Sequence, residues 1–158
     1  ELPENERFQE LWEASRHRYP VTITRNADWL RRRYPYLSPQ KYFHLTIERK
    51  GKYQAWAVCA VQRRKLTCVD LLWNGEDADD IHTLCRNMER LAKKKLCNTL
   101  QMWLNGDEQL KAALLEQYWQ QEPHPQQLQM VVRTFVEYLD RDDINECFYL
   151  TMGVSDLI

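Results

Sequence analysis

One carboxylate interrupts an apolar stretch near the middle of the chain. Asp70 lies between Val69 and Leu71, and strict strand alternation would place it on one face with Cys68 and Leu72. A carboxylate held among apolar side chains is a candidate general base, which would take a proton from an attacking amine. The position equally suits a structural carboxylate that pairs with a local arginine or a backbone donor. The sequence leaves both alternatives open.

The loop after this stretch concentrates further carboxylates. It reads Asn74-Gly75-Glu76-Asp77-Ala78-Asp79-Asp80 and precedes a long helical pattern. Acidic residues in the first turn stabilise a helix by about 0.3 to 1 kcal/mol each, and lysines such as Lys93-Lys94-Lys95 match its C-terminal end. The same acidic charges repel phosphate, which a helix N-terminus otherwise attracts. The loop is therefore interpreted as a helix cap.

The cysteines and histidines show no metal-ligating or nucleophilic pattern. The five cysteines are widely spaced without a CxxC pair, and the four histidines show no HxxxH or HxH spacing. Ser155 and Cys147 lack partners at the spacing of a catalytic triad. We expect reduced, mostly buried thiols, no metal and a cytoplasmic location.

Helical periodicity predicts the elements that flank these residues. Apolar residues recur at helical spacing over two segments, Asn26 is a candidate N-cap for a short helix between them, and a last helix follows the turn at Asn105-Gly106-Asp107. The predicted helices are Glu4 to Arg18, Ala27 to Arg33, Asp77 to Lys95 and a last one that ends at Trp119, in which Tyr118 is assigned to core packing.

Period-two alternation predicts a sheet between the helices. Residues 42–73 indicate an antiparallel meander of three strands, with turns at Gly51-Lys52 and near Arg64-Lys65. A strand at 98–104 should lie parallel to the strand that ends at Trp73, because a long helix separates them. Two last strands are expected at 128–135 and 146–152. The predicted fold class is α/β in the broad sense (α+β), a mixed sheet of six or seven strands flanked by helices.

Composition narrows the classes of function. The chain has 158 residues, 44% hydrophobic and 28% charged, which fits one globular domain over 1–158. A net charge of -1 argues against a nucleic-acid partner. The longest apolar run, Ala55 to Val61, is far below the roughly 20 residues of a membrane span. Because the chain begins at Glu1 without Met, we expect it to be part of a longer polypeptide.

The order of the elements and several segments resemble the GNAT superfamily of N-acetyltransferases. The resemblance covers nearly the whole chain and is carried by NADWLRRRY (26–34), the meander, LCRNMERLAKKK, LQMWL, LKAALLEQYW and ECFYLTMGVSD. These segments are similar to GNAT-like domains found with bacterial polysaccharide and cell-envelope genes. The resemblance implies an acetyl-CoA cleft where the strands around Trp73 and 98–104 splay apart.

The resemblance also implies roles for individual residues. Asp70 would be the base, and Leu72, Trp73, Asn74 and Gly75 would hold the thioester arm of the cofactor. Members of the superfamily cradle the pyrophosphate with a Q/R-x-x-G-x-G/A loop, whereas the segment here keeps one glycine and carries four carboxylates. The tyrosine that often serves as general acid is replaced by Leu114.

Two functions remain from these patterns. The first is a non-catalytic binding or assembly module of a larger bacterial envelope or polysaccharide protein, with no cofactor. The alternative is an acyl-CoA-dependent N-acyltransferase, which would take acetyl-CoA or another acyl thioester and an amine of a sugar, amino acid or cell-wall precursor. Expected partners are other domains of the same polypeptide or a second copy of the chain, without nucleic acid, membrane span or metal.

Overall fold

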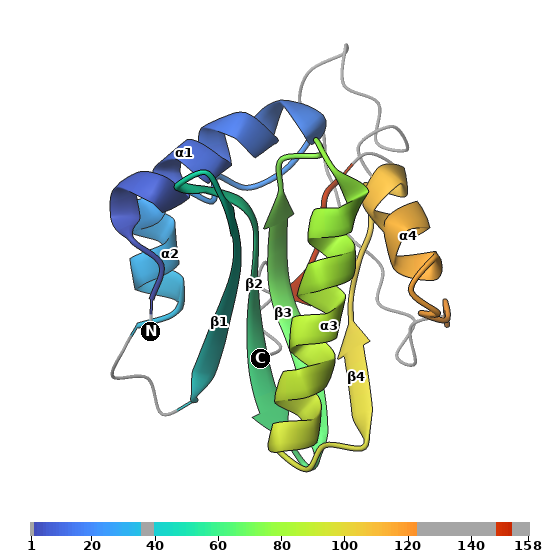
Figure 1. Ribbon diagram of the computed structural model, residues 1–158. Helices are drawn as coiled ribbons and strands as arrows, with labels where there is room; N and C mark the ends of the chain where they lie inside the picture. The colour runs from blue at the N-terminus through green and yellow to red at the C-terminus, as the bar shows by residue number, and fades with distance from the viewer. Residues whose placement is uncertain (1, 36–39, 123–147, 153–158) are drawn as a thin grey trace, which may run out of the picture.

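Four strands form one mixed sheet with helices on both sides (Figure 1). The structure is a computed structural model, which describes residues 2–35, 40–122 and 148–152. The strands are β1 (Tyr42–Arg49), β2 (Lys52–Gln62), β3 (Lys65–Trp73) and β4 (Thr99–Met102), in the order β1-β2-β3-β4. The first three are antiparallel, and β4 is parallel to β3 as predicted.

The prediction of six or seven strands is not confirmed. Segment 128–135 lies outside the described residues. Of the last predicted strand, the described part makes two isolated bridges, Phe148 with Val21 and Leu150 with Asn105. The described chain is therefore an α+β domain with a four-stranded sheet.

Helices cover both faces of the sheet. The helical elements are α1 (Asn5–Ser15), the 3-10 helix η1 (Arg16–Arg18), α2 (Ala27–Arg33), α3 (Ala78–Lys94) and α4 (Glu108–Leu115). Phe8 of α1 meets Trp56 of β2 edge-on, whereas Lys95 at the end of α3 lies over the ring of Phe43 in β1. Phe43 pairs with Cys59, so these two side chains share a face of the sheet. Cys59 lies three residues after Trp56 in β2, so Phe43 and Trp56 point to opposite faces. The sheet is thus enclosed between α1 with α2 and α3 (Figure 1).

Side-chain caps fix where three helices begin. Asn26 accepts a hydrogen bond from the Trp29 amide, Asp77 from Asp79 and Asp107 from Leu110. Such caps satisfy amide groups that the first helical turn leaves unpaired. The last helix ends at Leu115 and not at Trp119. Tyr118 has a φ of 62° and is 95% exposed, so its assignment to the core is wrong.

An irregularity in β3 turns Asp70 away from the cysteines. Val58 pairs with Asp70, but the next residue, Cys59, pairs with Cys68, so Val69 is an extra residue. Because neighbours in β2 point to opposite faces, so do Asp70 and Cys68. The predicted shared face of these two side chains is therefore wrong. Asp70 faces α1 and α2, while Cys68 lies beside Cys59 under α3.

The thiols in the described ranges are free, and three of the four are buried. The hydrogen bond to Cys59, followed by burial, raises the pKa of the Cys68 thiol. A neutral thiol is a weak nucleophile, so Cys68 behaves as a small core residue.

His44 gives the core a dependence on pH. It accepts a hydrogen bond from the Trp56 indole through Nδ1, at 3.2 Å, and burial lowers its pKa to about 4. An unfolded chain protonates this histidine below about pH 6.5. The unfolded state therefore binds the extra proton between these two values, and stability falls as pH falls through this window.

We expect acidification from pH 7 to pH 4.5 to cost about 2 kcal/mol more in the parent protein than in H44Q. Urea unfolding at the two pH values measures this difference. H17Q, which changes an exposed histidine, is the matched control and should keep the parental dependence. An H44Q variant with the full parental loss would contradict the assignment.

Candidate functional site

The carboxyl ends of β3 and β4 are the natural place for a ligand in this fold. Their parallel pairing ends at Cys68 and Met102, whereas β3 continues to Trp73. Among the described residues, the outer edge of β3 has no strand partner beyond Cys68, and α3 and α4 begin nearby. Ligands of open α/β sheets bind where neighbouring strands part at their carboxyl ends. We call residues 71–75 and 105–107 the strand-end site.

Tyr149 fills the first part of this edge. Its hydroxyl donates a 2.7 Å hydrogen bond to the Leu71 carbonyl oxygen, and its amide donates to the Val21 carbonyl oxygen. The ring stacks on Tyr19 with centroids 4.0 Å apart and is fully buried. The backbone acceptor that a ligand amide would use is therefore occupied by the protein.

Arg18 fills the second part. Its Nη1 donates to the Trp73 carbonyl oxygen at 2.7 Å, and its Nη2 lies 3.1 Å from both carboxylate oxygens of Asp107. The guanidinium also lies 4.5 Å from the centre of the Trp73 ring. Burial raises the pKa of Asp107, against the opposing effects of the Leu110 amide and Arg18. One arginine thus joins the end of β3 to the start of α4.

The residues assigned to the cofactor are engaged within the protein. Leu72 and Trp73 are fully buried, and the Asn74 side chain donates to Gln54 and accepts from the Glu76 amide. Gly75 has a φ of 81°, and a Cβ there would lie 2.5 Å from Nε of Arg18. The glycine makes room for the arginine. The four predicted residues thus lie at the carboxyl end of β3, where they are buried or contact Arg18 and other residues of the chain.

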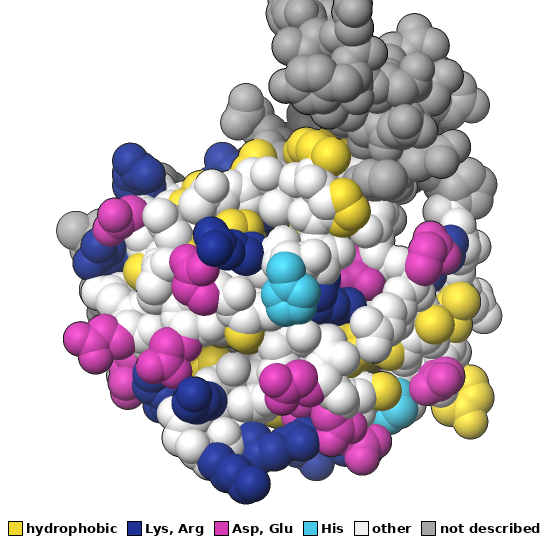
Figure 2. Space-filling view, turned by 90° about the horizontal axis from the view of Figure 1, so that it is seen from above, with side chains coloured by type: hydrophobic (Ala, Val, Ile, Leu, Met, Phe, Trp, Pro, Cys, Tyr) yellow, Lys and Arg dark blue, Asp and Glu magenta, His cyan; other side chains and the backbone are white. Residues whose placement is uncertain are grey.

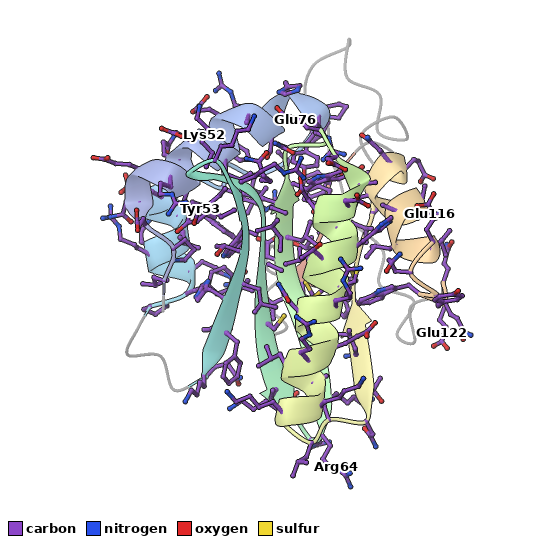
Figure 3. The ribbon with its side chains drawn as sticks, in the orientation of Figure 1. Lys52, Tyr53, Arg64, Glu76, Glu116 and Glu122 are labelled. Carbon is purple, nitrogen blue, oxygen red and sulfur yellow. The ribbon has the colours of Figure 1, made fainter. Side chains whose placement is uncertain are left out.

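The N-terminus of α3 carries its own anions. Asp77 caps the helix, and Arg49 of β1 bonds to both Asp77 and Asp80. The hydrogen bond from the Asp79 amide, followed by Arg49, lowers the pKa of Asp77. Glu76 lies at the same end of the molecule (Figure 3). Seen from above, acidic and basic side chains are mixed over this end (Figure 2). A phosphate would have to replace carboxylates that already occupy the N-terminus of α3, where Asp77 accepts a hydrogen bond from the Asp79 amide.

Asp70 belongs to a separate, buried cluster. Arg25 Nε lies 3.2 and 3.1 Å from its two oxygens, and the Thr151 hydroxyl and Leu71 amide donate to Oδ1. Arg25 and Asp70 have no exposed side-chain area. The Arg25 guanidinium also donates to Thr22 and lies 4.9 Å from the centre of the Tyr149 ring. This geometry favours the alternative in which Asp70 pairs with an arginine.

The key partners were missed in the sequence analysis because they are distant in the chain. Arg18, Arg25 and Tyr149 come from loops or segment ends, where periodicity carries no information. An arginine beside an apolar helix end is a weak signal. Only the fold shows that Arg18 reaches the Trp73 carbonyl oxygen, 55 residues further along the chain.

Comparisons of the chain with protein-family models, curated proteins and solved structures gave no match. Among the described residues, no helix combines the length and apolar character needed to cross a bilayer. The same ranges contain no group of three or more histidine, cysteine, aspartate or glutamate side chains arranged to hold a metal ion.

Proposed function

We propose that this chain is a GNAT-like domain without cofactor chemistry, serving as a binding or assembly module. The proposed link to a larger bacterial envelope or polysaccharide protein rests on the sequence resemblance. Support for a GNAT-like arrangement comes from the antiparallel meander, the long crossover helix α3 and the parting of β3 from β4.

One observation carries the proposal: protein side chains occupy the free edge of β3. An acyl-pantetheine arm between β3 and β4 would need acceptors on that edge, but Tyr149 bonds to Leu71 and Arg18 to Trp73. Displacing Arg18 would also strip Asp107 of its charged partner in a nearly buried position. Loss of such a partner costs several kcal/mol, which a cofactor would have to offset.

The acyltransferase alternative would need two further changes. Asp70 would have to leave Arg25 and Thr151 to accept a proton from an amine, although it is fully buried. The pyrophosphate would have to approach Glu76, Asp77 and Asp79. Two unit charges about 4 Å apart interact by roughly 4 kcal/mol at an effective dielectric constant of 20.

We therefore expect calorimetry to show no binding of acetyl-CoA up to about 1 mM. A Kd above this value corresponds to a binding free energy weaker than about 4 kcal/mol. The variant E76Q/D79N removes two carboxylates but keeps the Asp77 cap, and it should also fail to bind because Arg18 and Tyr149 remain. Chromatography of acetyl-CoA incubated with mixed amino sugars and amino acids should show no release of CoA above the protein-free rate. Micromolar binding of acetyl-CoA, or release of CoA that depends on the protein, would instead support the acyltransferase alternative.

A further inference from the structure

The end of the sheet opposite the strand-end site is strongly basic. It is formed by the β2–β3 turn and the end of α3, which lie side by side at the lower end of Figure 1. The Asn98 amide donates to the Arg64 carbonyl oxygen at 2.9 Å, and Arg64 Nε donates to that of Leu96. We define the basic end as Arg63, Arg64, Lys65, Lys93, Lys94, Lys95 and Leu96, with Arg64 labelled in Figure 3.

In the part of the chain that the structure describes, no neighbouring acid neutralises these cations. Segments 50–69 and 90–106 contain no aspartate or glutamate, and the acid next to them on α3 is Glu89, one turn before Lys93. Within the described ranges, no ion pair involves any cation of the basic end. Except for the half-buried Lys95, all of them are exposed. A protein of net charge -1 thus concentrates positive charge at one end.

The β2–β3 turn holds its arginines in an unfavourable conformation. Arg63 and Arg64 have φ values of 47° and 63°, and they form a two-residue connection between Gln62 and Lys65. Such a hairpin turn favours Asn-Gly, because positive φ crowds the Cβ of other residues. The turn therefore carries two charges where a neutral pair would be more stable.

The end of α3 also holds a residue other than glycine at a positive φ, and here that residue is apolar. Leu96 donates to the Lys93 carbonyl oxygen and Cys97 to that of Ala92, the hydrogen bonds of a Schellman motif. The position of Leu96 in this motif usually belongs to glycine, and its φ is 54°. Its side chain is 76% exposed between the basic turn and the lysines. Strained backbone that persists without a packing reason points to function.

We propose that the basic end binds the surface of an anionic lipid bilayer. The cations would meet the headgroup phosphates, and Leu96 would enter the interfacial region. A bilayer satisfies both features, because anionic lipids attract clustered lysine and arginine and the interface accepts apolar side chains. A soluble polyanion would use the charges but gain nothing from an exposed leucine. This surface is remote from the strand-end site, so the inference would hold for a catalytic domain as well.

Co-sedimentation with vesicles tests the proposal. At 100 mM salt we expect at least tenfold stronger partitioning onto 70:30 phosphatidylcholine:phosphatidylglycerol than onto pure phosphatidylcholine. Binding should weaken as salt rises, as expected for charges screened over a Debye length. Equal partitioning onto both vesicles, or no binding to either, would overturn the proposal.

Two variants separate binding from folding. R63N/R64G and L96G place favoured residues at the positive φ values, so each should raise Tm while it lowers vesicle partitioning at least threefold. K50N/K52Q removes two cations from the opposite hairpin turn and is the matched control, which should keep parental binding. The proposal is also overturned if K50N/K52Q loses as much binding as R63N/R64G, or if L96G binds vesicles like the parent. Tighter binding to heparin than to the anionic vesicles would instead assign the surface to a soluble polyanion.

Discussion

Replacing Asp70 with asparagine is expected to lower the free energy of unfolding by about 3 to 5 kcal/mol. The change removes the charge that balances Arg25, which has no exposed side-chain area. It also weakens acceptance of hydrogen bonds from Thr151 and the Leu71 amide. An uncompensated charge in the interior is far more costly than a missing surface pair. Urea unfolding of D70N at pH 7 measures the loss.

D28N is the matched control for this variant. Asp28 pairs with Arg31 on an exposed helix surface, with side chains 67% and 51% exposed, so its loss should stay within about 0.5 kcal/mol. The double variant R25M/D70L should lose less stability than the sum of R25M and D70L, because no charge is then left alone. A D70N protein within 1 kcal/mol of the parent would show that Asp70 is not tied to Arg25 in solution.

The second large effect is expected from Arg18. R18A removes the bridge from η1 to the Trp73 carbonyl oxygen and to Asp107, whose side chains are 10% and 5% exposed in the pair. Asp107 would keep its cap to Leu110 but lose its counterion. We expect a loss of about 2 to 4 kcal/mol, measured by urea unfolding.

R16A provides a close comparison for Arg18. Arg16 lies in the same short helix, but its side chain is 60% exposed and pairs with Glu13. Its loss should cost less than about 0.5 kcal/mol. Similar costs for R16A and R18A would contradict the view that Arg18 closes the strand-end site.

The elements that depend on local patterns could be predicted from the sequence. The helix Ala27–Arg33, the meander and the parallel β4 follow from caps, alternation and the length of the crossover. The last helix was predicted too long, since helical spacing extends to Tyr118 while the backbone leaves the helix after Leu115. Periodicity locates an element better than it locates its end.

The candidate site depended on information that local patterns do not hold. The face of Asp70 was wrong because alternation assumes no bulge, and no residue type marks Val69 as extra. The occupants of the β3 edge come from positions 18 and 149, one at each end of the chain. Their meeting depends on the tertiary path, which a single sequence leaves open.

The bulge at Val69 also limits which insertions and deletions the paired strands can tolerate. Adding one residue to β2 opposite Val69 would restore plain alternation and bring the Asp70 carboxylate to the same face as Cys68, among the thiols under α3. Arg25 and Thr151 would then lose their acceptor, and the carboxylate would face groups that cannot neutralise it. The length of β2 relative to β3 is therefore as tightly constrained as the composition of the two strands. Insertions should accumulate in exposed turns of the domain and be purged from this pair of strands.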